Sequence, residues 1–111
     1  MKHCMKLKRE PLEKIESGAK KYELRLYDEK RRLLRVGDTI EFTCEETAKK
    51  LTVTVTSLLG FGSFEELYSA LPLSECGYTP QEAEKASPRD MEKYYSRDEQ
   101  RKYGVLAIGI E

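Results

Sequence analysis

The sequence predicts an α+β domain built on a small, curled or barrel-like β-sheet with flanking helices. Three observations support this prediction. The chain has 111 residues, the length of one domain, so we expect a single domain over residues 1–111. Four or five segments read as strands that are too short to form a core as a flat sheet. Capping and apolar patterns in the second half predict helices, which we expect to cover the open end of a curled sheet.

Alternation of apolar and polar residues places the strands of the first half. Pro11 in a first helical turn, with Gly18 where a helix reverses direction, predicts a short helix after the first strand. The turn Val36-Gly37-Asp38 precedes the third strand, and a run rich in Val and Thr forms the fourth. The strands expected here are residues 3–8, 20–26, 38–44 and 50–59.

The second half of the chain carries helix signals and one last strand. Gly60 and Gly62 are expected to end the fourth strand, and Ser63 with Glu66 forms a capping box that begins a helix. Two further helices are expected, one after Thr79 and one that runs from Ser87-Pro88 to a stop at Gly104. Residues 105–110 (VLAIGI) read as a final buried strand. The expected order is therefore β-α-β-β-β, then helices, then β.

The charges of the chain cancel. Lys and Arg number 20, and Asp and Glu number 20. Proteins that grip long nucleic acids usually carry a basic excess, because contacts to phosphates supply much of the affinity. We therefore expect any contact with nucleic acid to be local, and a nucleoside, a nucleotide or a short RNA segment suits this chain better than a long duplex.

Cysteine and histidine usage gives no sign of a metal or a cofactor. The three cysteines, Cys4, Cys44 and Cys76, form no CxxC pair, and the chain has one histidine. Three unpaired thiols suggest a reducing compartment. The N-terminal residues contain no apolar run, and no stretch approaches the length of a membrane helix. We expect a cytoplasmic protein that does not contact membranes, without cofactor or metal, and a monomer.

The segment from Gly18 to Arg25 (GAKKYELR) is the candidate functional site. Strict alternation places Glu23 and Arg25 on one face of the strand, and Lys20 lies at the turn before it. If that face lines a cleft, these charged groups could recognise a planar polar ligand by hydrogen bonding and perturb each other's pKa values. We expect the three side chains to converge on one pocket, with Glu23 close enough to a cation to form an ion pair. The ordinary alternative is a solvated strand face, because alternating charged and apolar residues are typical of half-exposed antiparallel strands.

A short helix, the spacing G-x-K-x-x-E-x-R and a following V-G-D turn resemble the ASCH (activating signal cointegrator homology) domain, a branch of the PUA-like superfamily. Gly18, Lys20, Glu23 and Arg25 match the four motif positions, and the terminal VLAIGI strand also fits. The resemblance covers nearly the whole chain. It implies a small PUA-like β-barrel with flanking helices, and a cleft lined by the motif that binds RNA or a modified nucleoside.

Some ASCH proteins of similar length are N4-acetylcytidine amidohydrolases with a Lys, a Thr and a distant Glu in the pocket. The resemblance places Lys20 at the Lys position and Glu75 near the distant Glu, whereas Glu23 stands where those enzymes have Thr. If this chain were such an enzyme, Lys20, Glu23 and Glu75 would be its catalytic residues. Glu23 would then act as a general base on water, which differs from the hydroxyl of those relatives.

Three functions remain open from the sequence. The first is a binding module for RNA, a nucleoside or a nucleotide, with Gly18, Lys20, Glu23, Arg25 and Tyr95 as ligand-binding residues. In this module Lys20 and Arg25 would contact phosphate or carbonyl oxygens, and Glu23 would accept from a base edge. The Tyr95 ring could stack on a base or simply pack in the core. The second is a small amidohydrolase that acts on a modified nucleoside. The third is a protein-interaction domain in which Glu23 and Arg25 pair internally for structural reasons.

Overall fold

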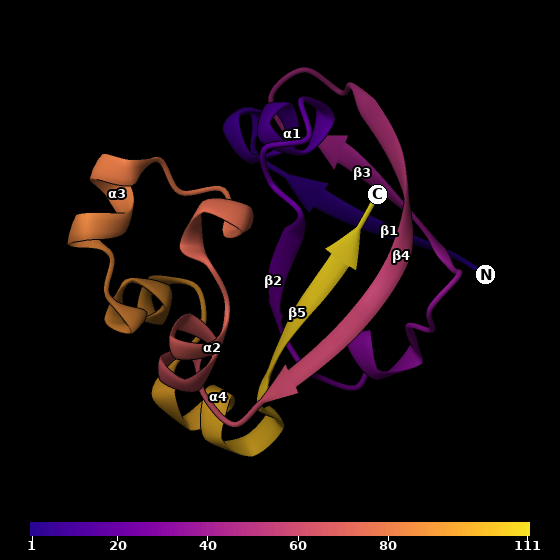
Figure 1. Ribbon diagram of the computed structural model, residues 1–111. Helices are drawn as coiled ribbons and strands as arrows, with labels where there is room; N and C mark the ends of the chain where they lie inside the picture. The colour runs from indigo at the N-terminus through magenta and orange to yellow at the C-terminus, as the bar shows by residue number, and fades with distance from the viewer.

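The computed structural model describes residues 1–111, and its five strands form one open, curled sheet (Figure 1). The strand order is β1-β3-β4-β5-β2, in which β1 and β3 are parallel and the other neighbours antiparallel. The strands are β1 (Lys2–Leu7), β2 (Tyr22–Leu26), β3 (Thr39–Cys44), β4 (Lys50–Phe61) and β5 (Val105–Ile110). The predicted α+β fold is confirmed as a half-barrel whose two open edges are β1 and β2.

Strand β4 produces much of the curl because it belongs to both halves of the sheet. Its first half pairs with β3 and its second half with β5, and the register shifts between Val55 and Ser57. The prediction that Gly60 ends the strand was wrong, since β4 continues to Phe61 and Gly60 pairs with β5. The glycine is needed for contact rather than for a turn: a Cβ there would lie 3.2 Å from the ring of Tyr27.

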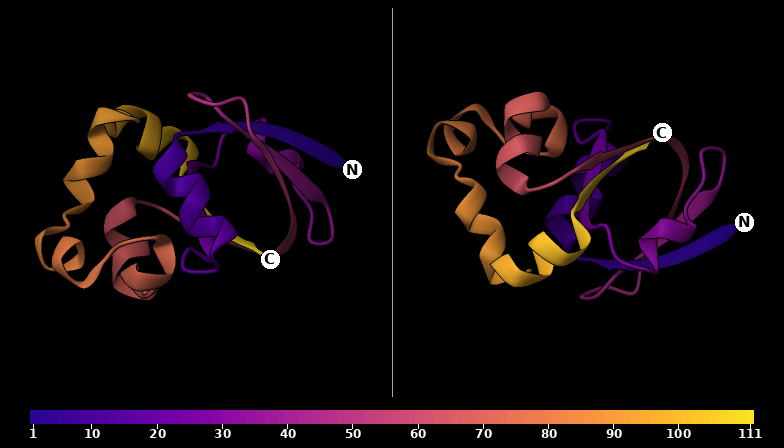
Figure 2. Two further views of the ribbon diagram at one scale, coloured as in Figure 1. Left: turned by 90° about the horizontal axis from the view of Figure 1, so that it is seen from above. Right: turned by 90° about the horizontal axis from the view of Figure 1, so that it is seen from below.

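Helix α1 (Arg9–Glu16) connects the two edge strands and lies across one end of the sheet (Figure 2). Its Leu12 and Ile15 side chains are buried, as predicted. Gly18 follows in the left-handed conformation with a φ of 84°. This glycine reverses the chain into β2, which is the role that the sequence indicates.

The remaining helices form a lobe beside the sheet: α2 (Phe64–Ala70), α3 (Pro80–Lys85) and α4 (Arg97–Tyr103), with 3₁₀ turns over Leu73–Cys76 and Pro88–Lys93 (Figures 1 and 2). A further 3₁₀ turn covers Arg31–Leu33. The prediction of one helix from residue 88 to Gly104 was wrong. Ser96 accepts a hydrogen bond from the Glu99 amide and the Glu99 side chain accepts one from the Ser96 amide, so a capping box begins a separate helix.

Two apolar clusters fill the molecule. The larger cluster occupies the inside of the half-barrel and includes Phe42, Val55 and Ile108. The smaller cluster joins the helical lobe to β5 through Phe64, Leu67 and neighbouring side chains. No helix combines the length and the apolar character that a membrane crossing requires.

Candidate ligand-binding site

The side chains of β2 alternate between the two faces of the sheet. Tyr22 and Leu24 pack against the cluster of the helical lobe. Glu23 and Arg25 point to the other face, where their partners on β5 are Ile108 and Leu106. Glu23 is only 4% exposed, so the interpretation of this segment as a solvated face was wrong. A carboxylate at such a position requires cationic or hydrogen-bonding partners.

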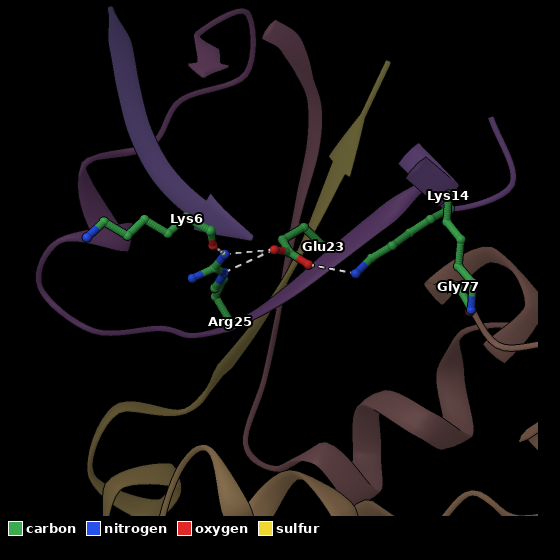
Figure 3. A network of polar contacts seen from close by, with 6 residues as sticks. Lys6, Lys14, Glu23, Arg25 and Gly77 are labelled. Carbon is green, nitrogen blue, oxygen red and sulfur yellow. Dashed lines mark hydrogen bonds and ion pairs between the residues drawn. The ribbon is translucent and has the colours of Figure 1, made fainter. Parts of the chain in front are cut away.

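Lys20, Glu23 and Arg25 form one ionic group, here called the motif cluster. Figure 3 shows Glu23 and Arg25 of this cluster. Lys20 Nζ donates to Glu23 Oε1 over 2.8 Å. Arg25 donates to Glu23 Oε2 from Nη2 over 2.8 Å and from Nε over 3.2 Å. The ion pair that the sequence predicts for Glu23 is thus present with both cations. Hydrogen bonds of this charge-assisted kind are the strongest that side chains make.

The motif cluster lies at the gap between the two open edges of the half-barrel. Arg25 belongs to β2, and its Nη2 also donates to the carbonyl oxygen of Lys6 on β1 over 2.9 Å (Figure 3). Since β1 and β2 are not paired with each other, this side chain bridges the gap that a closed barrel would fill with backbone hydrogen bonds.

The Lys20 side of the motif cluster packs against Gly77, directly after the 3₁₀ turn Leu73–Cys76. Gly77 has a φ of 95°, and a Cβ there would lie 3.0 Å from Lys20 Cδ, so the Lys20 stem packs directly on the glycine. Lys14 of α1 donates to the Gly77 carbonyl oxygen over 2.6 Å. The Lys21 amide donates to the Glu75 carbonyl oxygen over 2.6 Å, which ties the same segment to the edge of β2.

The ionic state of the cluster follows from its contacts. Burial by itself would raise the pKa of Glu23, but Lys20 and Arg25 outweigh it and the pKa lies below its usual value. Burial opposes the charge of Arg25 as well, yet Glu23, and after it Tyr95, raise the pKa of the guanidinium. Glu23 and Arg25 are therefore both charged at neutral pH, and two basic side chains with one carboxylate give the cluster a formal charge of +1.

One aromatic side chain, Tyr95, lies beside Arg25, and one thiol, Cys76, lies near Lys20. The Tyr95 ring stacks on Phe64 with their centroids 6.1 Å apart, while Tyr94 is exposed to solvent. The hydroxyl groups of Tyr68 and Tyr78 are 2.6 Å apart. Burial raises the pKa of the Cys76 thiol to about 11 in spite of the nearby Lys20, so this thiol stays protonated and is a poor nucleophile.

A groove of about 690 Å³ lies beside the start of β2, between the end of α1, β4 and the end of β5. Three of the predicted site residues, Gly18, Lys20 and Glu75, line it, whereas Glu23, Arg25 and Tyr95 do not. The carboxylate of Glu75 lies 3.9 Å from Lys21 Nζ, a separate ion pair from that of Glu23. The structure therefore gathers Lys20, Glu23 and Arg25 and leaves Glu75 outside their ion pairs.

Three contributors to the site were missed by sequence reasoning: Lys14, Gly77 and the Lys6 carbonyl group. The one sequence signal for Gly77 is that it is a glycine a few residues after Pro72. Glycines in such turns often take left-handed conformations. The sequence carries no signal for the contacts of Lys14 and Lys6, since these contacts depend on how β1, α1 and the helical lobe meet.

A comparison with protein families decides which family this arrangement represents. The family model of the ASCH domain matches residues 5–111. The chain belongs to the ASCH domain family. The match covers nearly the whole chain and includes the motif cluster, so the family resemblance inferred from the G-x-K-x-x-E-x-R spacing is confirmed.

Solved structures of similar fold support this assignment. The crystal structure of the hypothetical protein PH0355 is 37% identical with a TM-score of 0.83, and the match covers 100% of this chain and 98% of that protein. A solution structure of PF0455 from Pyrococcus furiosus is 35% identical with a TM-score of 0.69, covering 100% and 96%. ASCH from Zymomonas mobilis is 20% identical with a TM-score of 0.67, covering 99% of this chain and 66% of that one, and this likeness concerns the fold. No curated protein matches the ASCH chain described here.

Proposed function

We propose that this ASCH domain binds RNA or a nucleotide-like ligand at the motif cluster. The ASCH domain has a PUA-like fold, which is consistent with RNA binding in general. The observation that carries the proposal is the composition of the cluster: one buried carboxylate, Glu23, holds two cations, Lys20 and Arg25, whose side chains keep 10% and 14% of their surface accessible. Two cations held in a fixed arrangement at an open edge of the sheet suit a ligand that brings oxygen acceptors.

The alternative of an amidohydrolase receives less support from this geometry. A general base must accept a proton from water, but both oxygens of Glu23 already accept hydrogen bonds from cations. The lowered pKa of Glu23 also makes it a weak base near neutral pH. Glu75 is 35% exposed and pairs with Lys21 rather than with the cluster. Binding is therefore the function that the site supports best.

The alternative of a purely structural motif predicts the same internal pairing of Glu23 and Arg25, so a binding experiment must separate the two. Lys20 and Lys21 provide a matched pair of variants. They are neighbours in the chain with the same charge, but Lys20 belongs to the cluster and the Lys21 side chain is 63% exposed with a distant partner.

Fluorescence anisotropy with a labelled single-stranded RNA of about ten nucleotides tests the proposal. We expect Lys20→Ala to weaken binding about tenfold, the effect of losing one charge-assisted hydrogen bond. We expect Lys21→Ala to change it by less than about twofold, since exposed pairs of this kind contribute little. Equal effects of the two substitutions, or no binding by the unmodified protein to RNA or to free nucleotides, would contradict the proposed function.

A further inference from the structure

We propose that the motif cluster recognises a phosphate group of its ligand, and that Glu23 is an internal counter-ion that makes no contact with the ligand. This inference deepens the proposed function and rests on it. It narrows the ligand from nucleosides in general to those that carry a phosphate, either as a terminal monoester or as the diester of an RNA backbone.

The first step concerns the acceptors of the site. Glu23 is the carboxylate of the cluster, and its side chain is 5% exposed. Lys20 Nζ donates to its Oε1, and Arg25 Nη2 and Nε donate to its Oε2. A donor on a base edge would have to displace one of these charge-assisted hydrogen bonds to reach the carboxylate. Reading of a base edge by Glu23, one role that the sequence suggests for it, is therefore disfavoured.

The second step concerns the donors that remain. The Lys20 ammonium group has three N–H bonds and makes one hydrogen bond within the chain. The hydrogen bonds of Arg25 to Glu23 and Lys6 use Nε and Nη2, and the Tyr95 side chain also lies beside the guanidinium. Nη1 therefore has no carboxylate or carbonyl partner. The Cys76 thiol near Lys20 is buried and is not available to a ligand. The groups offered to a ligand are thus donors, and both are cationic.

The third step is the charge balance. Two cations and one carboxylate leave a net charge of about +1 at the cluster, in a setting where burial opposes charge. A neutral carbonyl group could accept hydrogen bonds there but would leave this charge uncompensated. A phosphate oxygen both accepts from Lys20 and Arg25 and neutralises the excess, and an arginine fork matches its geometry. Phosphate is therefore the ligand group that satisfies both requirements.

Isothermal titration calorimetry of the full chain tests this with four probes: cytidine, cytidine 5′-monophosphate, an unphosphorylated trinucleotide of cytidine, and inorganic phosphate. We expect the monophosphate to bind at least about tenfold more tightly than cytidine, as a charge-assisted contact requires. The trinucleotide, which has diesters and no terminal phosphate, separates backbone recognition from recognition of a monoester. Equal affinity for cytidine, its monophosphate and the trinucleotide would overturn the inference and leave the proposed function standing.

The remaining outcomes distinguish the two proposals. Binding of inorganic phosphate as tight as that of the nucleotides would support phosphate recognition but contradict a nucleotide-binding function. Absence of binding by all four probes and by RNA would overturn both. These comparisons use the unmodified protein and do not depend on the folding of any variant.

The substitution Glu23→Gln provides an independent test, with Glu41→Gln as its control. Glu41 of β3 also lies between two lysines, 2.9 Å from Lys2 Nζ and 3.6 Å from Lys50 Nζ, but it is not part of the cluster. If Glu23 is an internal counter-ion, the folded Glu23→Gln variant should bind cytidine 5′-monophosphate at least as tightly as the unmodified protein. A loss greater than about threefold in the folded Glu23→Gln variant, with Glu41→Gln unchanged, would contradict the inference that Glu23 only balances the charge of the two cations.

Discussion

Glu23 accepts hydrogen bonds from Lys20 and Arg25 at a position that is almost fully buried. A buried carboxylate of this kind is stabilising only as long as its cations remain in place, because each charge has been removed from water. The same contacts keep Glu23 ionised and hold the two cations at the open edge of β2. At the scale of single residues, stability therefore depends on all three side chains, whereas the proposed ligand contacts come from the two cations.

This dependence predicts a pH-sensitive effect of Glu23→Gln on the free energy of unfolding. We expect the free energy of unfolding to fall by about 2–4 kcal/mol at pH 7. This loss is somewhat smaller than the loss from breaking a fully buried ion pair, because Lys20 and Arg25 can be rehydrated. The folded pKa of Glu23 is below its unfolded value. Its contribution is therefore complete above about pH 4.3 and is lost as the pH falls further.

Urea titrations of the unmodified protein and the variant at pH 7, 5 and 3 measure this difference. We expect the gap between their unfolding free energies to be largest at pH 7 and to shrink between pH 5 and pH 3. A gap that stays constant over this range, or that is below about 0.5 kcal/mol at pH 7, would mean that the ion pairs of Glu23 do not stabilise the fold.

At the scale of elements, two glycine turns position the cluster on β2. Gly18 ends α1 and starts the approach to β2, while Gly77 follows the 3₁₀ turn Leu73–Cys76 and carries the Lys20 stem. Both have positive φ, but a Cβ at Gly18 would meet nothing within 4 Å, whereas one at Gly77 would lie 3.0 Å from Lys20 Cδ. The two positions therefore share backbone strain and differ in their contact with the site.

Alanine at each glycine separates strain from contact. We expect Gly18→Ala and Gly77→Ala each to lower the free energy of unfolding by about 1–2 kcal/mol, the penalty of a left-handed alanine. We expect Gly77→Ala alone to weaken ligand binding as well, because Lys20 must move away from the new methyl group. Chemical denaturation and RNA binding of both variants test this. Equal binding by the two variants would show that the packing of Lys20 on Gly77 does not position the ammonium group.

The elements also show what a sequence can and cannot predict here. The strands and α1 were found from alternation and from capping residues, since these signals act between neighbours in the chain. The continuation of β4 through Gly60 was missed because it depends on packing against Tyr27. The break at Ser96 was missed because a Ser-x-x-Glu capping box can also lie unnoticed inside a long polar helix pattern.

The same distinction applies to the site. Alternation on β2 predicted that Glu23 and Arg25 share a face and that Glu23 pairs with a cation, because both follow from local geometry. The contacts of Arg25 with Lys6 and of Lys20 with Gly77 join segments that are distant in the chain. No pattern within one segment reveals such contacts, so the burial of the cluster could be found only from the fold.

At the scale of the whole molecule, the proposed ligand site lies at one edge of a half-barrel that has no net charge. The chain carries 20 basic and 20 acidic residues, so its overall field does not attract nucleic acid strongly. The helical lobe and β1 approach the cluster from two sides, through Gly77 and through the Lys6 carbonyl group. The account therefore predicts one small contact area for the ligand rather than an extended basic surface.

Nuclear magnetic resonance of the ¹⁵N-labelled protein during titration with a short single-stranded RNA tests this central claim most directly. The account predicts that the largest chemical-shift changes occur at the Arg25 Nε–H signal and at the amides of Lys20, Glu23, Arg25 and Gly77. Changes confined to other parts of the molecule, such as the helical lobe away from Gly77, with these signals unmoved at saturation, would contradict a ligand site at the motif cluster.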